Sequence, residues 1–200
     1  MSPLRVPPDP RQLAVHFPAY HLATNLQLAR IHKSRRGPWW FASVGSDPHT
    51  AGRFDLLSPK GTCYLAESPV GAFLESLQRV IGVGKAIPMS EILIRSVSTL
   101  NVPREMWLAD CTHKAATSFG ITGAISSGGD RVLTQKWATA FEAAGLEGIR
   151  YLAQGDPSQH EVSIALFHDT GGAPWAVNLI EPIKAGLLDD VERQFHIKVR

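Results

Sequence analysis

A strand that leads directly into a helix, between residues 61 and 80, constrains the fold of this chain more than any other stretch. Gly61–Ala66 is expected to form the strand, because Thr, Cys and Tyr suit a pleated surface and Pro59-Lys60-Gly61 is a turn signal. Ser68 and Pro69 then mark the start of a helix, with Ser68 as its N-cap and Pro69 at its first position.

The helix is predicted to run from Pro69 to about Val80, with one apolar face at helical spacing. That face consists of Val70, Phe73, Leu74, Leu77, Val80 and Ile81. At ~100° per residue, Glu75 lies nearly opposite, beside Gly71 and Ala72. A single helical glutamate is usually a solvated surface carboxylate. Here the two small neighbours leave an open patch that a ligand or another backbone could approach.

Composition and charge exclude several classes of protein. The 200 residues fit one domain, and a net charge of +2 is too small to imply nucleic acid as a partner. Cys63 and Cys111 match no metal spacing and form no disulfide framework, so they are expected to be reduced thiols in a cytoplasmic protein. The eight histidines show no metal-ligand spacing, and no metal site is expected. Since the first ten residues contain no apolar stretch and no apolar run is long enough to span a membrane, neither a signal peptide nor a membrane span is expected.

The order of the expected elements favours an α+β fold with one globular domain, because strands and helices alternate without a regular βαβ rhythm. A proline-rich leader and short helix occupy residues 1–25, and the domain proper spans residues 26–200. Further strands are expected at Leu26–His32, Glu91–Val97, Gly148–Ala153, Val162–Phe167 and Ala176–Ile180. Helices are expected at Gln12–Ala19, Thr112–Phe119, Arg131–Ala144 and around Leu187–Phe195. Asp130 is expected to be the N-cap of the helix that begins at Arg131. Leu100–Asp110 and Ser126–Asp130 are expected to be irregular.

Ser34–Gly52 is a long loop that contains three consecutive aromatic residues, Trp39-Trp40-Phe41. Loops of this length are often binding loops. Two interpretations are open. The aromatic side chains either pack onto the core, or they anchor a protein partner together with the adjacent Arg35 and Arg36.

Common enzyme motifs such as GxGxxG, GxxxxGKS, HExxH and GxSxG are absent from the sequence. What remains is a set of three side chains around one strand and helix: Arg53, Tyr64 and Glu75. An arginine binds a phosphate through two parallel hydrogen bonds, and a tyrosine offers a flat face to a ring. A carboxylate stabilises positive charge that develops on a sugar carbon. The set suits an anionic ligand with an aromatic ring.

At these residues the sequence resembles the RES-domain family. Arg30 resembles the first family arginine, and Arg53 in Gly52-Arg53-Phe54 resembles the second. Tyr64 in Tyr64-Leu65-Ala66-Glu67-Ser68 resembles the strand tyrosine, and Glu75 resembles the family glutamate. The resemblance spans about residues 26–167, and it continues in Thr134–Ala138, Gly148–Tyr151 and Ile164–Phe167.

The resemblance implies a fold like that of ADP-ribosyltransferase toxins, with small mixed or antiparallel sheets and flanking helices. It also implies a bacterial toxin of a toxin–antitoxin module, with NAD+ as substrate and an Xre-type helix-turn-helix antitoxin as partner. Arg30 and Arg53 would hold the pyrophosphate or ribose side, and Tyr64 would stack near the nicotinamide. Glu75 would bind a ribose hydroxyl and stabilise the oxocarbenium-like transition state.

The chain departs from the family pattern at two points. Ile31 follows Arg30 where many members have an aromatic residue, so that stacking role is empty or passes to His32. For the family serine, Ser127 is the first choice as a catalytic residue. Its rivals are Ser126, Thr134 and Ser158.

Three functions stay open at the level of the sequence. The first is hydrolysis or phosphorolysis of the nicotinamide–ribose bond of NAD+. The second is mono-ADP-ribosylation of a protein. The third is a catalytically idle binding module that keeps the fold for contact with a partner.

Overall fold

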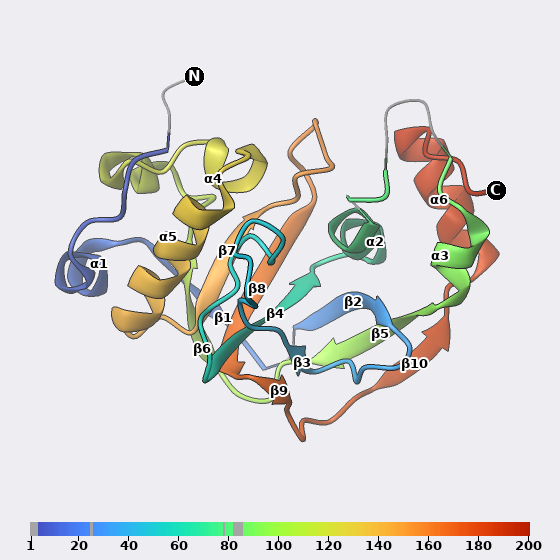
Figure 1. Cartoon of the computed structure of the whole chain (residues 1–200), viewed down its shortest axis with the longest axis horizontal. Coiled ribbons are helices and arrows are strands. Elements are labelled where there is room, and N and C mark those ends of the chain that lie inside the picture. The colour runs from blue at the N-terminus through green and yellow to red at the C-terminus, as the bar shows by residue number, and fades with distance from the viewer. Residues whose placement is uncertain (1–3, 25, 78, 82–85) are drawn as a thin grey trace.

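An eight-stranded sheet organises the computed structural model, which describes residues 4–24, 26–77, 79–81 and 86–200 (Figure 1). Its strand order is β1-β6-β7-β8-β4-β2-β5-β10, and only the β6–β7 pair among these neighbours is parallel. The strands are β1 (Ala19–Leu22), β2 (Gln27–Lys33), β4 (Lys60–Ala66), β5 (Arg95–Asn101), β6 (Met106–Asp110), β7 (Gly148–Leu152), β8 (Val162–Asp169) and β10 (Leu179–Pro182). Short strands β3 (Trp40–Phe41) and β9 (Gly171–Gly172) form a second, two-stranded sheet. The mixed sheets with flanking helices confirm the α+β prediction.

The helices gather at the two ends of the large sheet (Figure 1). At one end lie α1 (Pro10–His16), the 3-10 helix η1 (Lys114–Phe119), α4 (Ala124–Ser127) and α5 (Arg131–Ala143). At the other end lie α2 (Pro69–Leu77), α3 (Met89–Leu93) and α6 (Ala185–Phe195). Helix α5 packs against β7 and α1, whereas α2 packs against β2, β4 and α6.

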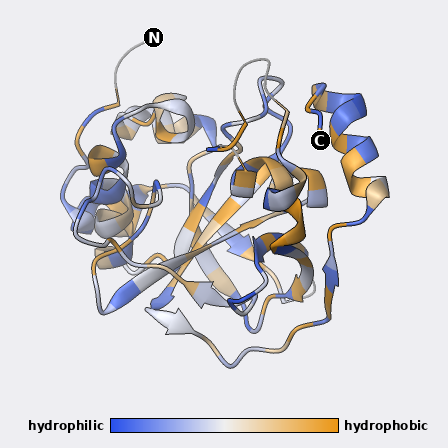
Figure 2. Cartoon of the chain, turned by 45° about the vertical axis from the view of Figure 1, so that its right-hand side comes forward, coloured by the Kyte–Doolittle hydropathy of each residue, from blue (hydrophilic) through white to orange (hydrophobic). Residues whose placement is uncertain are grey.

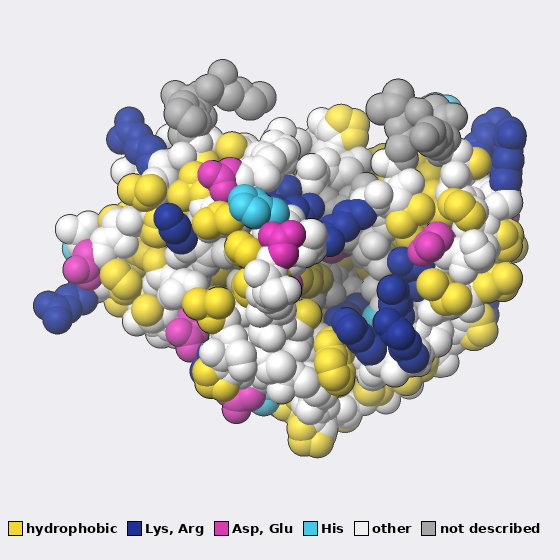
Figure 3. Space-filling model, in the orientation of Figure 1, with side chains coloured by type: hydrophobic (Ala, Val, Ile, Leu, Met, Phe, Trp, Pro, Cys, Tyr) yellow, Lys and Arg dark blue, Asp and Glu magenta, His cyan; other side chains and the backbone are white. Residues whose placement is uncertain are grey.

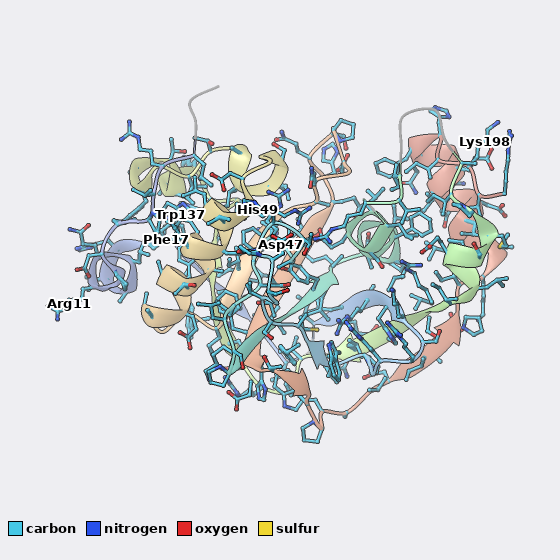
Figure 4. The ribbon with its side chains drawn as sticks, in the orientation of Figure 1. Arg11, Phe17, Asp47, His49, Trp137 and Lys198 are labelled. Atoms are coloured by element: carbon cyan, nitrogen blue, oxygen red, sulfur yellow. The ribbon has the colours of Figure 1, made fainter. Side chains whose placement is uncertain are left out.

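Each group of helices has its own hydrophobic cluster against the sheet. At the α5 end, the Phe17 ring lies 6.5 Å from the Trp137 ring and 4.7 Å from the Phe141 ring, measured between centroids (Figure 4). At the α2 end, Phe73 and Leu77 are fully buried between the sheet and α6. Figure 2 shows the apolar residues along the central strands and α2, and mixed polarity on α6.

The predicted strand–helix unit has the expected form, and it lies at the centre of the sheet. Strand β4 has β8 on one side and β2 on the other. The hydroxyl of Ser68 accepts a hydrogen bond from the Gly71 N–H at 2.8 Å, as expected of an N-cap. Helix α2 ends at Leu77, somewhat earlier than the sequence pattern predicts. The unit therefore holds Tyr64 on a central strand and Glu75 on the helix that follows it.

Three segments in the middle of the chain differ from the predictions. Glu91 belongs to the short helix α3, and the strand predicted at 91–97 begins only at Arg95, because Pro88 sets the start of one helical turn. The predicted irregular segment 100–110 contains strand β6, since Met106 and Leu108 point into the core and pair with β1. The predicted loop at 126–130 includes the last residues of the single-turn helix α4.

The last expected strand, 176–180, is displaced toward the C-terminus and forms β10. The first helix starts earlier than predicted, because Asp9 caps it by accepting the Arg11 N–H at 2.8 Å. Within residues 1–25, of which residues 1–3 and 25 lie outside the described part, β1 forms an edge of the large sheet. That segment therefore contributes to the fold and is more than an extended leader.

The aromatic residues of the long loop pack mostly inward. Trp39 and Phe41 are buried, and the indole N–H of Trp39 donates to the Ala176 carbonyl at 2.9 Å. Trp40 is half-buried, and the guanidinium of Arg36 lies over its ring at 5.2 Å. Of the two interpretations, packing onto the core therefore describes Trp39 and Phe41.

Candidate active site

A cavity of about 210 Å³ opens between β2, β4 and α2, and Arg30, Arg53, Tyr64 and Glu75 all line it. The other lining residues are Ile31, Gly52, Leu65, Ala72, Ser76, Arg79 and Arg131. The structure thus brings together four residues that lie up to 45 positions apart in the sequence, from Arg30 to Glu75. Arg30 comes from the middle of β2, Tyr64 from β4 and Glu75 from α2, whereas Arg53 comes from the loop before β4.

The hydroxyl of Tyr64 is fixed by two hydrogen bonds. It donates to the Asp55 carboxylate at 2.8 Å and accepts from the Phe54 N–H at 2.8 Å. Asp55 also accepts the Gly52 N–H at 2.6 Å. A Cβ on Gly52 would lie 2.5 Å from the Tyr64 hydroxyl, so only glycine fits this close approach. The phenol end is therefore anchored in the protein, which leaves the ring as the part of Tyr64 that borders the cavity.

The Arg53 guanidinium is buried and oriented by neutral acceptors. It donates to the Gly128 carbonyl and to the Gln154 side-chain oxygen, both at 2.7 Å. Burial lowers the pKa of Arg53, the nearby Arg131 charge lowers it further, and Glu75 is among the groups that raise it again. Because these two hydrogen bonds go to neutral oxygens, and no carboxylate of the described residues forms an ion pair with it, Arg53 brings positive charge to the cavity.

Arg30 is held by the aromatic loop. Its guanidinium donates to the carbonyls of Pro38 and Trp40, the latter at 3.0 Å, and lies 2.7 Å from the Cys63 sulfur. Burial raises the pKa of Cys63 to about 11, and the Arg30 charge opposes that shift. At neutral pH Cys63 is therefore a neutral thiol, and the charge of Arg30 remains uncompensated by it.

Glu75 has one side toward the cavity and the other toward β7 and β8. The Ser163 hydroxyl donates to its carboxylate at 3.3 Å. The buried Tyr151 hydroxyl lies close to both groups. Burial raises the pKa of Glu75. The Tyr151 hydroxyl, the positive charge of Arg53 and the Ser163 hydroxyl each lower it again. The carboxylate is thus partly desolvated and kept near a cation, as expected of a group that must stabilise positive charge.

The open patch predicted beside Glu75 is only partly available to a ligand. Ala72 lines the cavity, but Gly71 faces protein, since a Cβ there would lie 2.7 Å from the Glu161 carboxylate. Glu75 is therefore approached from the cavity, past Ala72, and not across the Gly71 side of the helix.

Two cavity arginines were not singled out from the sequence. Arg79 donates to the carbonyls of Thr50 and Ala51, and Arg131 donates to Ala51 as well. Arg131 begins the helix that Asp130 caps through the Leu133 N–H at 2.9 Å. Figure 3 shows Lys and Arg side chains gathered around the central hollow. With four arginines and one carboxylate in its lining, the cavity attracts anions.

Of the hydroxyl residues considered for the family serine, the structure brings none into contact with Glu75. Ser127 is exposed, and its hydroxyl donates to the Gly123 carbonyl at 3.0 Å. Ser158 donates to Asp156, and Thr134 donates to the Arg53 carbonyl at 2.6 Å, so Thr134 supports Arg53 from behind. Ser126 does not line the cavity. Ser163 does contact Glu75, and only its alternation within Val162–Phe167 hinted that it faces α2.

The described residues contain no group of three or more His, Cys, Asp or Glu side chains suited to a metal ion. Likewise, none of the helices in the described part of the chain is long and apolar enough to cross a membrane.

A family model for the RES domain matches residues 27–182. The chain belongs to the RES-domain family. Its fold is similar to that of a chain in the crystal structure of the M. tuberculosis MbcT–MbcA toxin–antitoxin complex, with a TM-score of 0.65 and 15% sequence identity over 87% of this chain and 92% of that one. No curated protein sequence matches the chain. The family match includes Arg30, Arg53, Tyr64 and Glu75, the residues on which the resemblance rested.

Proposed function

We propose that this RES-domain protein cleaves the nicotinamide–ribose bond of NAD+. The observation that carries the proposal is the cavity itself, which is lined by Glu75, Tyr64 and four arginines. NAD+ combines a diphosphate with an aromatic ring on a ribose. Its cleavage leaves positive charge on the ribose carbon as nicotinamide departs, and a preorganised carboxylate stabilises that charge.

Each residue has a role that follows from its surroundings. Arg53 and Arg30 bind the diphosphate, because their guanidinium groups are held by neutral oxygens and keep their charge. The Tyr64 ring stacks near the nicotinamide, since its hydroxyl is anchored away on Asp55. Glu75 accepts a ribose hydroxyl and faces the developing cation, while Ser163 orients its carboxylate. Ser127 does not line the cavity, and its link to the site is through the chain, because the next residue, Gly128, accepts a hydrogen bond from Arg53.

Incubation of the purified protein with NAD+ tests the activity directly. We expect free nicotinamide, with ADP-ribose as the second product in plain buffer or ADP-ribose 1″-phosphate when phosphate is present. Transfer of labelled ADP-ribose to protein, seen by mass spectrometry of a cell extract, would identify a mono-ADP-ribosyltransferase instead. If neither nicotinamide nor a labelled protein appears, the chain is a catalytically idle binding module.

Arg53→Lys should weaken NAD+ binding although the charge is retained. An ammonium group is a point charge and does not reproduce the two-point grip of a guanidinium on phosphate. We expect a loss of about 10-fold in affinity, the equivalent of one charge-assisted hydrogen bond. Isothermal titration measures it, and a thermal melt shows whether the buried site still folds.

Arg35→Lys is the matched control for that variant. Arg35 is exposed, lies in the basic segment before the aromatic loop and does not line the cavity. Equal affinities of both variants and wild type for NAD+ would make Arg53 a structural residue.

We also propose an antitoxin partner that restrains the activity, of the Xre-type helix-turn-helix class. A protein that consumes NAD+ harms the cell that makes it, and the similar fold in the MbcT–MbcA complex supports a toxin–antitoxin arrangement. Expression of the chain alone should lower cellular NAD+ and slow growth, and co-expression with the protein encoded beside it should restore both. Unchanged NAD+ and growth during expression alone would contradict the toxin assignment.

A further inference from the structure

A second hollow, of about 200 Å³, adjoins the candidate active site. It shares Arg30, Ile31, Tyr64 and Ser76 with the first cavity, so the two form one continuous groove. The residues found only in the second hollow are His32, Lys33, Arg36, Trp40, Ala42, Thr62 and Arg95.

The lining of the second hollow carries cations and no carboxylate. Arg95 is already neutralised, because it pairs with Glu91 at 2.6 Å. Lys33 and Arg36 are different, since both are exposed and neither pairs with any carboxylate of the described residues. Lys33 and Arg36 therefore supply two positive charges at this hollow that are available to bind an anion.

The same hollow has a surface suited to a flat ring. The Arg36 guanidinium lies over the half-buried Trp40 ring at 5.2 Å, and that stacked pair borders the hollow. Trp40 is fixed from behind, because its carbonyl accepts a hydrogen bond from Arg30 at 3.0 Å. A purine can stack on an exposed guanidinium or indole face.

His32 lines the second hollow with an uncharged imidazole ring. Its ring bonds to the Ser98 hydroxyl at 2.8 Å and to the Lys33 carbonyl at 3.2 Å. Burial lowers the pKa of His32, although the Lys33 carbonyl opposes that shift. Besides Arg30, which borders both hollows, the charge that an incoming anion meets at this end comes from Lys33 and Arg36.

The number of cations exceeds what NAD+ requires. Arg30, Arg53, Arg79 and Arg131 already face the first cavity, where a diphosphate with two negative charges would lie. Lys33 and Arg36 stand apart from them at the other end of the groove. In Rossmann-type folds an arginine near the adenosine ribose accommodates a 2′-phosphate, and Lys33 and Arg36 offer the same chemistry here.

We propose that the second hollow binds the adenosine end of a dinucleotide and prefers one that carries a 2′-phosphate, so that NADP+ is a better substrate than NAD+. This inference rests on the proposed function, because it takes the first cavity as the nicotinamide end. Lys33 and Arg36 bind the 2′-phosphate, and Arg36 together with Trp40 receives the adenine.

The test is a pair of titrations in the Glu75→Gln background, in which slowed turnover leaves the ligand largely intact during the measurement. NADP+ and NAD+ differ by one phosphate, so the ratio of their dissociation constants isolates the contribution of that group. We expect NADP+ to bind about 10-fold tighter at ~0.15 M salt, because a charge-assisted hydrogen bond survives moderate screening. Lys33→Gln combined with Arg36→Gln should remove the preference, and the matched control Arg35→Gln should keep it.

Two results would overturn the inference: equal affinities for the two dinucleotides in the background protein, or a preference that persists in the Lys33→Gln/Arg36→Gln protein. A failure of the proposed function would give a different result from a failure of this inference. In that case the wild-type protein releases nicotinamide from neither dinucleotide, whatever the titrations give. Release from NAD+ and NADP+ with equal kcat/KM keeps the proposed function and removes the preference.

Discussion

Replacing Glu75 with Gln should lower the rate of nicotinamide release by about 10²–10³-fold, the usual loss when one preorganised electrostatic partner is removed from a transition state. The amide keeps the size of the side chain and can still bond to Ser163, but it carries no negative charge toward the ribose carbon. Nicotinamide release at saturating NAD+ measures the effect. Wild-type turnover by this variant would remove Glu75 from the chemistry.

The same variant should fold at least as stably as the wild type at neutral pH. Burial raises the pKa of Glu75 in the folded state above its unfolded value, so ionisation of this group costs stability. That cost is absent below the unfolded pKa, grows as pH rises through the folded pKa and is constant above it. Thermal melts at pH 4 and pH 7 should therefore show that Glu75→Gln gains stability relative to wild type as pH rises. A variant that loses stability at pH 7 would show that inactivity came from misfolding.

Trp137→Ala should destabilise the fold by about 3–5 kcal/mol, the range for a large aromatic residue removed from a core. Trp137 is fully buried, packs against Phe17 and Phe141, and donates its indole N–H to the Arg5 carbonyl at 2.7 Å. Its removal leaves a cavity between α5 and the N-terminal segment. Urea unfolding followed by circular dichroism measures the free energy of unfolding.

Trp107→Ala is the control for that substitution. Trp107 lies on β6 with 52% of its surface exposed, and its ring rests on His21 at the edge of the sheet. We expect a change of about 0.5 kcal/mol, as for most surface substitutions. A comparable loss from both variants would mean that the Trp137 cluster is not the core of this end of the molecule.

Local sequence was sufficient where each residue's neighbours along the chain decide the conformation. The strand–helix unit around Tyr64 and Glu75 and the Asp130-capped helix could be predicted, because turn residues, caps and apolar periodicity act over a few positions. Strand β6 and the edge strand β1 could not, since their pairing joins Ala19–Leu22 to a segment almost 90 residues away and the prolines of the leader masked it.

The sequence by itself determined the family and singled out Arg30, Arg53, Tyr64 and Glu75, the four residues that line one cavity in the structure. Only the tertiary structure decided which other residues lie next to these four. Ser163 reaches Glu75 across 88 positions, and Arg131 enters the cavity from the first turn of α5. The physical reason is that a strand or helix pattern tells which face of an element is apolar, whereas contacts between elements depend on the pairing order of the sheet. That order folds β8 against β4 and thereby places a buried serine beside the carboxylate.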